Sequence, residues 1–430
     1  MTISAIINNS LTGLFTSQAA LRTISDNVSN VNTPGYARKV VRLDPRLTGS
    51  QGAGVQISGI ERVVDKFLEK SVYTTKADAA RYELENTFYA RVQALLGRPD
   101  VNSSLSGKIN DVFNSISELA LNPLSTILKE GAVSRLNAFG DEIGMLGENM
   151  QNMRLDASSQ IAETTEKINS LLKRIDFLNP LIVKETVTTG DAGSLIEQRA
   201  QALSELSELI DINIIETGNN KIDISTKSGV YLIGNDRREL QYNSPGAVSS
   251  STPFPPITIN NVDPTTGNIS STGLTLDENV SGGELYGLLN LRDKELVAMS
   301  EELGALASGV LNEFNRVHNE NSAAPAPNAL NGNNTGMLTT DPHNFTGQST
   351  FAVTDANGNL VDSITIDFGV TGPNFSDVIT AVNAGLAGNA TLGLNNGVMS
   401  LTATAGTNGV SISQTSGSES DRSGSGFSQF

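Results

Sequence analysis

The segment with the best spacing for chemistry is DANGNLVD, Asp355 to Asp362, which places oxygen-bearing side chains at alternate positions. A calcium loop of the EF-hand type uses such oxygens, but it needs glycine at its sixth position and a bidentate glutamate at its twelfth. Here Gly358 stands at the fourth position and Ile366 at the twelfth. Asn-Gly between two alternating segments is also a strong hairpin signal. We therefore expect a turn at this segment rather than a metal site.

The sequence offers no other catalytic arrangement. It has two histidines, His318 and His343, and no cysteine, so material for a histidine metal site, a triad or a thiol nucleophile is scarce or absent. It also lacks the glycine-rich phosphate loop and the dinucleotide fingerprint. We expect no catalytic residue, no metal and no cofactor, and we predict that the protein is not an enzyme.

The charge excludes two further classes of function. Lys and Arg total 29 against 46 Asp and Glu, a formal net charge of −17. Proteins that bind nucleic acid or anionic lipid normally carry a basic surface, so we expect neither partner. No apolar run approaches the roughly 20 residues of a membrane helix, which argues against membrane insertion. The first cation is Arg22, whereas a signal peptide begins with positive charge, so any export should proceed without a cleaved signal peptide.

The elements that could position functional surfaces begin with a helix over residues 3–31. Apolar side chains recur every seven residues in this segment, and further apolar residues lie three or four positions from that row. Such a seam predicts a coiled-coil-type helix that packs against a partner helix, although an ordinary core helix remains the alternative. The residues of the predicted assembly interface are Ile7, Leu14, Leu21, Ile24, Val28 and Val31.

A turn follows this helix and leads into a β-rich neck. Pro34 disfavours helical geometry at Thr33, and Gly35 tolerates positive φ, so the helix should end here. The next two segments, ARKVVRLDPRL and GAGVQISGIERV, alternate as strands do.

The rest of the chain predicts an α+β multidomain protein with an elongated helical bundle as its body. Helical periodicity covers 67–96, 105–121, 133–178, 194–210 and 283–318, and the segment 133–178 would span about 65–70 Å. Ser194 and Glu197 have the spacing of a capping box. We expect three parts: 1–65 as axial helix, turn and neck; 66–330 as the bundle with a small β insertion near 211–282; and 331–430 as linker and β-rich outer domain.

Two groups of segments resemble a known family. SLTGLFTSQAALRTISDNVSNVNTPGYARKVV resembles the N-terminal segment of bacterial flagellar axial proteins. LIEQRAQALSELSELIDINI and GGELYGLLNLRDKELVAMSEELGALASGVLNEFNRVHNENS are similar to the family of flagellar hook-associated protein 1, the first hook–filament junction proteins. Residues 350–413 resemble a small β-rich repeat inserted in flagellins and hook-associated proteins. The family also has a C-terminal axial helix that pairs with the N-terminal one, and we expect this chain to be truncated before it.

The resemblance implies a structural subunit of the flagellum that joins hook to filament. The implied partners are copies of itself, the hook protein on one side, the next hook-associated or filament protein on the other, and an export chaperone. The implied location is extracellular, at the hook–filament junction. The implied role of the turn is to fix the angle between the axial helix and the outer domains, and its residues are Asn27, Asn30, Thr33, Pro34, Gly35 and Tyr36.

Two alternatives remain open. A hook or distal-rod subunit would share the opening motif, but we do not expect it to have the long helix over 133–178. An extracellular hydrolase on a flagellar scaffold would need convergent acids or a metal.

Overall fold

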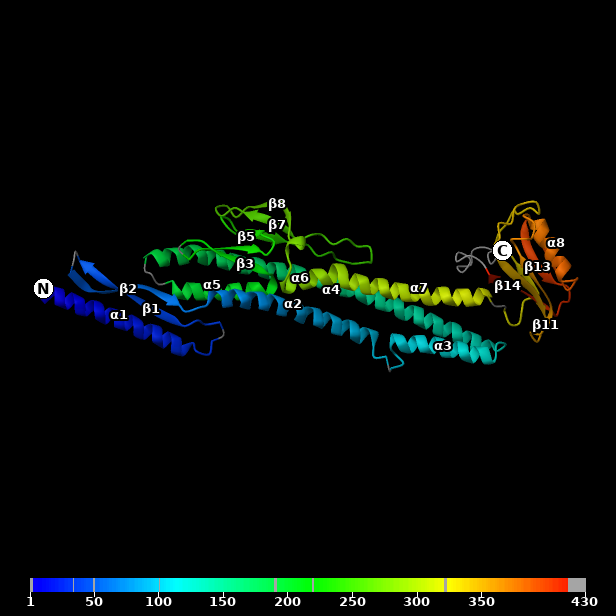
Figure 1. The fold of residues 1–430 in the computed structure, drawn as a ribbon, viewed down its shortest axis with the longest axis horizontal. Helices are drawn as coiled ribbons and strands as arrows, with labels where there is room; N and C mark the ends of the chain where they lie inside the picture. The colour runs from blue at the N-terminus through cyan, green and yellow to red at the C-terminus, as the bar shows by residue number, and fades with distance from the viewer. Residues whose placement is uncertain are drawn as a thin grey trace. The chain divides into compact units, whose positions relative to one another are not determined.

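The chain folds as an α+β protein of several parts (Figure 1). The computed structural model describes residues 3–33, 35–48, 51–99, 101–188, 192–218, 220–320 and 323–416. Contacts divide the chain into two compact units. Unit 1 comprises residues 1–96 and 147–300, and unit 2 comprises residues 97–146 and 301–430. The division at 65 and 330 stays a prediction.

The helices lie close to where the apolar periodicity places them. Their bounds are α1 Ile3–Ser29, α2 Lys66–Leu96, α3 Leu105–Leu121, α4 Thr126–Thr188, α5 Gly193–Leu209, α6 Gly283–Asn290, α7 Leu296–Glu320 and α8 Phe375–Gly385, with a π turn at Leu291–Glu295 and a 3-10 turn at Asp277–Asn279. The predicted helix over 283–318 is thus interrupted by the π turn, where the side chain of Arg292 is buried.

The long helix α4 extends beyond the predicted 133–178 at both ends. It continues through Pro180, which supplies no amide donor and normally ends or kinks a helix. Leu178 and Ile182 lie on either side of Pro180 and pack together with Ala192, so tertiary packing holds this last part of the helix.

One face of α4 forms the core of unit 1. The side chains of Met150, Ile161, Ile168 and Ile175 are almost completely buried, as their helical spacing predicts. Helices α2, α5 and α6 pack against one another in the same unit. Phe88 of α2 is also fully buried. The hydrophobic stripe of α4 therefore organises the helical part of unit 1.

The two alternating segments of the neck form an antiparallel hairpin, β1 Lys39–Thr48 and β2 Gln51–Arg62. The pairing begins with Lys39 opposite Arg62 and shifts register at two places. Asp65 caps α2, because its Oδ1 accepts the Phe67 and Leu68 amides at 2.9 and 3.2 Å. Only Val63 and Val64 separate the hairpin from this cap.

Two small sheets follow α5 in unit 1. Their strands are β3 Ile212–Glu216, β4 Ile222–Thr226 and β5 Tyr231–Ile233 in one sheet, and β6 Arg238–Gln241, β7 Thr258–Val262 and β8 Ile269–Thr275 in the other. The loop before β7 is held by two buried arginines. Phe254 lies 5.0 Å from the Arg154 guanidinium and 4.7 Å from that of Arg292, and Arg154 Nε donates to the Arg292 carbonyl at 2.9 Å.

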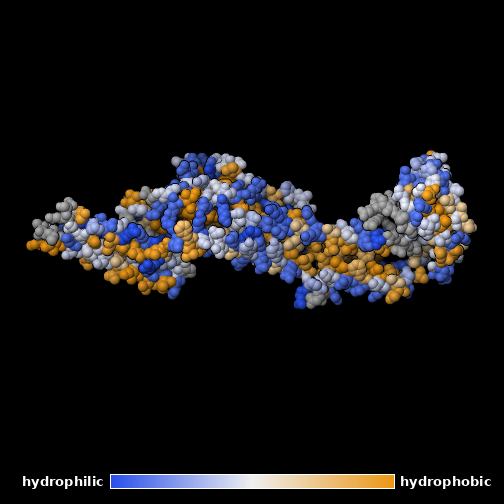
Figure 2. Space-filling view, viewed as in Figure 1, coloured by the Kyte–Doolittle hydropathy of each residue, from blue (hydrophilic) through white to orange (hydrophobic). Residues whose placement is uncertain are grey.

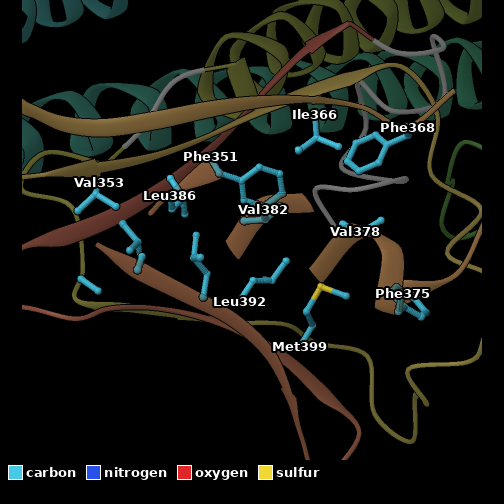
Figure 3. Close-up of a cluster of buried hydrophobic side chains, with 14 residues drawn as sticks. Phe351, Val353, Ile366, Phe368, Phe375, Val378, Val382, Leu386, Leu392 and Met399 are labelled. Atoms are coloured by element: carbon cyan, nitrogen blue, oxygen red, sulfur yellow. The ribbon is translucent and has the colours of Figure 1, made fainter. Parts of the chain in front are cut away.

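Residues 329–416 of unit 2 form a β-rich domain around one hydrophobic core, into which Phe351, Val353 and Val382 point (Figure 3). Its strands are β9 Ala329–Asn331, β10 Gln348–Thr354, β11 Leu360–Asp367, β12 Ala390–Asn395, β13 Val398–Ala403 and β14 Gly409–Ser416. They form two sheets of order β11-β10-β14 and β12-β13-β9. Helix α8 contacts both β11 and β12.

The five carboxylates in residues 323–416 accept hydrogen bonds, four of them in local turns or caps and Asp362 from the distant Asn389 side chain. Asn374 and Asp377 form a capping box at the start of α8. The capping box predicted for Ser194 and Glu197 is absent, because the N-cap of α5 is Ala192 and no side chain makes a cap hydrogen bond there. Hydrogen bonds are also accepted by the carboxylates of Asp341, Asp355, Asp362 and Asp367. This part of the sequence contains no Lys or Arg.

The core of this domain makes a direct test possible, because the chain offers the same substitution at a buried and an exposed site. Val353 is 0% exposed and Val370 is 85% exposed. We expect Val353→Ala to lower the unfolding free energy of the domain by about 2 kcal/mol, through lost burial and a residual cavity. Val370→Ala should change it by less than about 0.5 kcal/mol. Hydrogen exchange of the β10 amides measures both, and equal effects would contradict the assignment of the core.

Candidate assembly interface

One face of helix α1 rests on the β1–β2 hairpin, and this face is made of small and polar side chains. The positions of α1 and the following turn that are not exposed step by three and four along the chain. They are Asn9, Thr12, Gly13, Thr16, Ala19, Ala20, Thr23, Asn27 and Asn30. This small-residue face lets the backbone of the hairpin approach the helix closely.

One such close approach is at Gly54 of β2. The Thr12 hydroxyl accepts a hydrogen bond from the Val55 amide at 3.3 Å. A Cβ on Gly54 would lie 2.2 Å from Thr12 Oγ1, and Gly54 also has a φ of +105°. Glycine is therefore required here both by the space and by the backbone conformation.

The apolar stripe of α1 points away from the hairpin and is exposed. Ile7, Leu14, Leu21 and Val28 are 58%, 55%, 67% and 68% exposed, and Ile24 and Val31 are 57% and 74% exposed. At 3.6 residues per turn this stripe lies on a different side of the helix from the small-residue face, about a third of a turn away. Apolar groups accordingly gather on the surface over α1 (Figure 2). Ile6 and Phe15 are exposed as well.

The side chain of Asn27 joins the end of α1 to the start of β1. Its Nδ2 donates to the Lys39 carbonyl and its Oδ1 accepts the Lys39 amide, both at 2.8 Å. The Tyr36 hydroxyl donates to the same Oδ1 at 3.0 Å. The Asn27 side-chain amide thus hydrogen-bonds both the N–H and the C=O of Lys39, as a residue of a neighbouring β-strand would.

The remaining residues of the predicted turn hold its local conformation. Asn30 Nδ2 donates to the Asp26 carbonyl at 3.0 Å, and the Thr33 hydroxyl donates to Asn30 Oδ1 at 3.3 Å. Gly35 has a φ of +81°. Pro34 lies outside the described residues.

Tyr36 sits among charges at this joint. Desolvation raises the pKa of its phenol, and the nearby carboxylates of Asp26 and Glu197 raise it further. The ammonium group of Lys39 lies 5.4 Å from the centre of its ring. The phenol therefore stays protonated and able to donate to Asn27 at neutral pH.

The described residues hold no group of three or more His, Cys, Asp or Glu that could bind a metal ion. The calcium candidate is a turn: Asp355 Oδ1 accepts the amides of Asn357 and Asn359 at 2.9 and 2.8 Å. His343 is fixed in the β-rich domain, where its Nδ1 accepts the Phe345 amide at 2.9 Å. The side chain of His318 lies outside the described residues. Within the described part of the chain no helix is long and apolar enough to span a membrane.

The fold and this surface define an α+β protein whose N-terminal helix exposes an apolar face. Residues 7–36 match the family model described as flagella basal body rod protein. Residues 89–336, more than half of the chain, match the model described as flagellar hook-associated protein FlgK helical domain. The chain therefore belongs to the FlgK family of flagellar hook-associated proteins.

The relatives found by sequence similarity agree with this assignment. The chain is 26% identical to flagellar hook-associated protein 1 of Salmonella typhimurium over 324 residues, which cover 74% of this chain and 57% of that protein. It is 26% identical to the Bacillus subtilis protein of the same name over 46% of this chain and 41% of that protein. The flagellar hook junction protein FlgK from Burkholderia pseudomallei has 20% sequence identity and a TM-score of 0.48, over 81% of this chain and 62% of that one. The chain thus spans little more than half the length of the Salmonella relative.

The joint at Asn27 yields a test by hydrogen exchange. We expect Asn27→Ala to speed exchange of the Lys39 amide at least tenfold, because that amide then loses its acceptor. The control is Asn32→Ala, which changes an exposed asparagine of the same segment and should leave the exchange rate of the Lys39 amide unchanged. An unchanged exchange rate of the Lys39 amide in Asn27→Ala would show that the Asn27 side chain does not hold the start of β1.

The turn at Asp355 predicts a specific pH response. Hydrogen bonds from the Asn359 side chain and backbone lower the pKa of this carboxyl below its ordinary value of 3.8. The stability it contributes is fully present above the unfolded-state pKa and is lost as pH falls through the lower folded-state pKa. Carbon-detected NMR titration should place the midpoint of Asp355 below 3.8. A calcium-dependent shift of the Asp355 signals would instead support a metal site.

Proposed function

We propose that this protein is a structural subunit of the bacterial flagellum that joins hook to filament. The observation that carries the proposal is the exposed apolar stripe of α1, on a helix whose small-residue face is already held by the hairpin. Among the described residues this stripe has no cover, although its seven-residue repeat is that of a helix–helix contact. Membership of the FlgK family supports a flagellar role for that contact.

The stripe favours assembly because no described part of this chain buries it. Burial of apolar surface stabilises a contact by about 25 cal/mol per Å². The interface residues are those predicted from the heptad, namely Ile7, Leu14, Leu21, Ile24, Val28 and Val31. Asn27, Asn30 and the turn to Tyr36 set the direction in which this helix leaves the body of the protein.

The proposed partners are those that the resemblance to hook-associated proteins implies. Copies of this chain pack side by side through α1, with the hook protein on one side and the next hook-associated or filament protein on the other. An export chaperone covers apolar surface before assembly. The location is the flagellum outside the cell, and export leaves α1 intact, because cleavage within α1 would remove part of the stripe. We propose no enzymatic activity.

Two other readings are less well supported. A hook or rod subunit would account for the match over residues 7–36 but not for the match of the FlgK helical domain. A hydrolase would need convergent acids or a metal site, and the described residues hold no group of three or more His, Cys, Asp or Glu that could bind a metal ion.

The test is a charge placed in the stripe. We expect Leu21→Asp to abolish binding to isolated hook ends, because an unpaired buried charge costs several kcal/mol. Its thermal unfolding should match the parent protein, since Leu21 is 67% exposed in the single chain. Asn8→Asp places the same charge at an exposed polar position of α1 outside the stripe and should still bind.

Negative-stain microscopy of hooks incubated with each variant gives the readout. Binding of Leu21→Asp at the level of the parent protein would remove the stripe from the interface. A large loss of melting temperature in Leu21→Asp would place Leu21 in the core of the single chain instead.

A further inference from the structure

The N-terminal module, residues 3–62 with α1, β1 and β2, joins the helical bundle of unit 1 through a very short connection. β2 ends at Arg62, and Asp65 already caps α2. The Val63 amide donates to the Arg38 carbonyl at 2.8 Å, which keeps the start of this connection within the hairpin. A pivot between module and bundle can therefore lie only at Val63 and Val64.

Arg62 makes a second, non-covalent connection across this point. Its Nε lies 3.0 Å from Glu197 Oε2 on α5, and its Nη2 lies 3.7 Å from Glu69 Oε1 on α2. The side chains of Arg62 and Glu197 are only 11% and 22% exposed. Neither Arg62 Nε nor Glu197 Oε2 makes a hydrogen bond, so charge alone holds the pair.

The surroundings make this pairing necessary. Arg199 on α5 is 6% exposed and donates to Asn179 Oδ1 at 2.9 Å and to the Asn220 carbonyl. Burial lowers the pKa of Arg199 to about 10; Glu216 opposes that shift, and the positive charge of Arg62 adds to it. Two poorly solvated guanidinium groups therefore lie close together, and each needs an anionic or carbonyl partner.

The contact continues directly into the joint of α1. Arg62 pairs with Lys39 in the ladder, and Lys39 is the residue that Asn27 holds. Glu197 also lies close enough to raise the pKa of Tyr36. A single path thus runs from α1 through Asn27, Lys39 and Arg62 to α5.

We propose that the Arg62–Glu197 ion pair, supported by Glu69, is a latch that sets the angle between the N-terminal module and the helical bundle. With the latch closed, the module has one orientation. With the latch open, the module pivots at Val63 and Val64 while both the hairpin and the bundle stay folded. Arg62 is a positioning residue, and its role does not depend on which partner α1 meets.

The absence of cysteine from the sequence makes the angle measurable with two introduced spin labels. Gln56→Cys on β2 and Ser71→Cys on α2 are both exposed positions, one on each side of the pivot. Double electron–electron resonance on the full chain should give one narrow distance distribution. Arg62→Gln should at least double its width, and Glu197→Gln should have a similar effect.

Arg42→Gln is the matched control. Arg42 forms a 3.2 Å ion pair with Glu61 within the same hairpin, with side chains 69% and 55% exposed, and this pair does not cross the pivot. Its removal should leave the distribution narrow. The double reversal Arg62→Glu with Glu197→Arg should restore the narrow distribution, at least in part, and circular dichroism establishes that each variant is folded.

A narrow distribution in Arg62→Gln would overturn the latch, as would equal broadening in Arg42→Gln. Failure of the charge reversal to narrow the distribution relative to Arg62→Glu alone would also overturn the specific pairing with Glu197. The distance distribution is measured without hook ends, so a failure of the latch and a failure of the proposed function can be told apart.

Discussion

The side chain of Asn27 makes the contact on which the geometry of the N-terminal module depends. An asparagine amide carries a donor and an acceptor side by side, so it can pair with both backbone groups of one residue. Here that residue is Lys39, the first residue of β1. The contact fixes where α1 stops relative to where β1 starts, and the turn between them only has to close the chain.

The position of α1 explains why its sequence has two different stripes. The small-residue face allows the hairpin backbone to come close, as the contact between Thr12 and Gly54 requires. A helix held in this way keeps its large aliphatic side chains on the other face. Intramolecular packing and an exposed apolar surface are therefore compatible in one helix, because they use different sides of it.

Much of this fold could be predicted from the sequence, because helical and strand periodicity report which face is buried. The stripe of α4, the hairpin after the turn and the core strand at Phe351 all follow that rule. The heptad of α1 can also be recognised in the sequence. The small-residue face of Thr, Ala and Asn cannot be found by hydrophobic periodicity, because its side chains are small or polar. A search for small residues at the same spacing would have found it.

Other features depend on residues far apart in the chain, which local patterns do not report. Ser194 and Glu197 have capping-box spacing, but the prediction of a cap there was wrong because α5 already begins at Gly193 with Ala192 as its N-cap. The Glu197 carboxylate pairs with the distant Arg62 instead. The π turn at Arg292 was missed for a similar reason, since the buried contacts of that side chain come from Tyr242 and Asp277. The end of α4 was placed too early because Pro180 is a strong local signal that packing overrides.

The lack of Lys and Arg in the β-rich domain has a practical consequence for protease experiments. Trypsin cuts after lysine and arginine, and the sequence contains neither between Arg316 and Arg422. The domain would therefore stay in one tryptic fragment whether it is folded or unfolded. Survival of that fragment carries no information about folding, and peptide mapping with trypsin would leave this region as a single very large peptide. A protease that cuts at aromatic residues, such as Phe351 in the core, would report directly on whether the domain is closed.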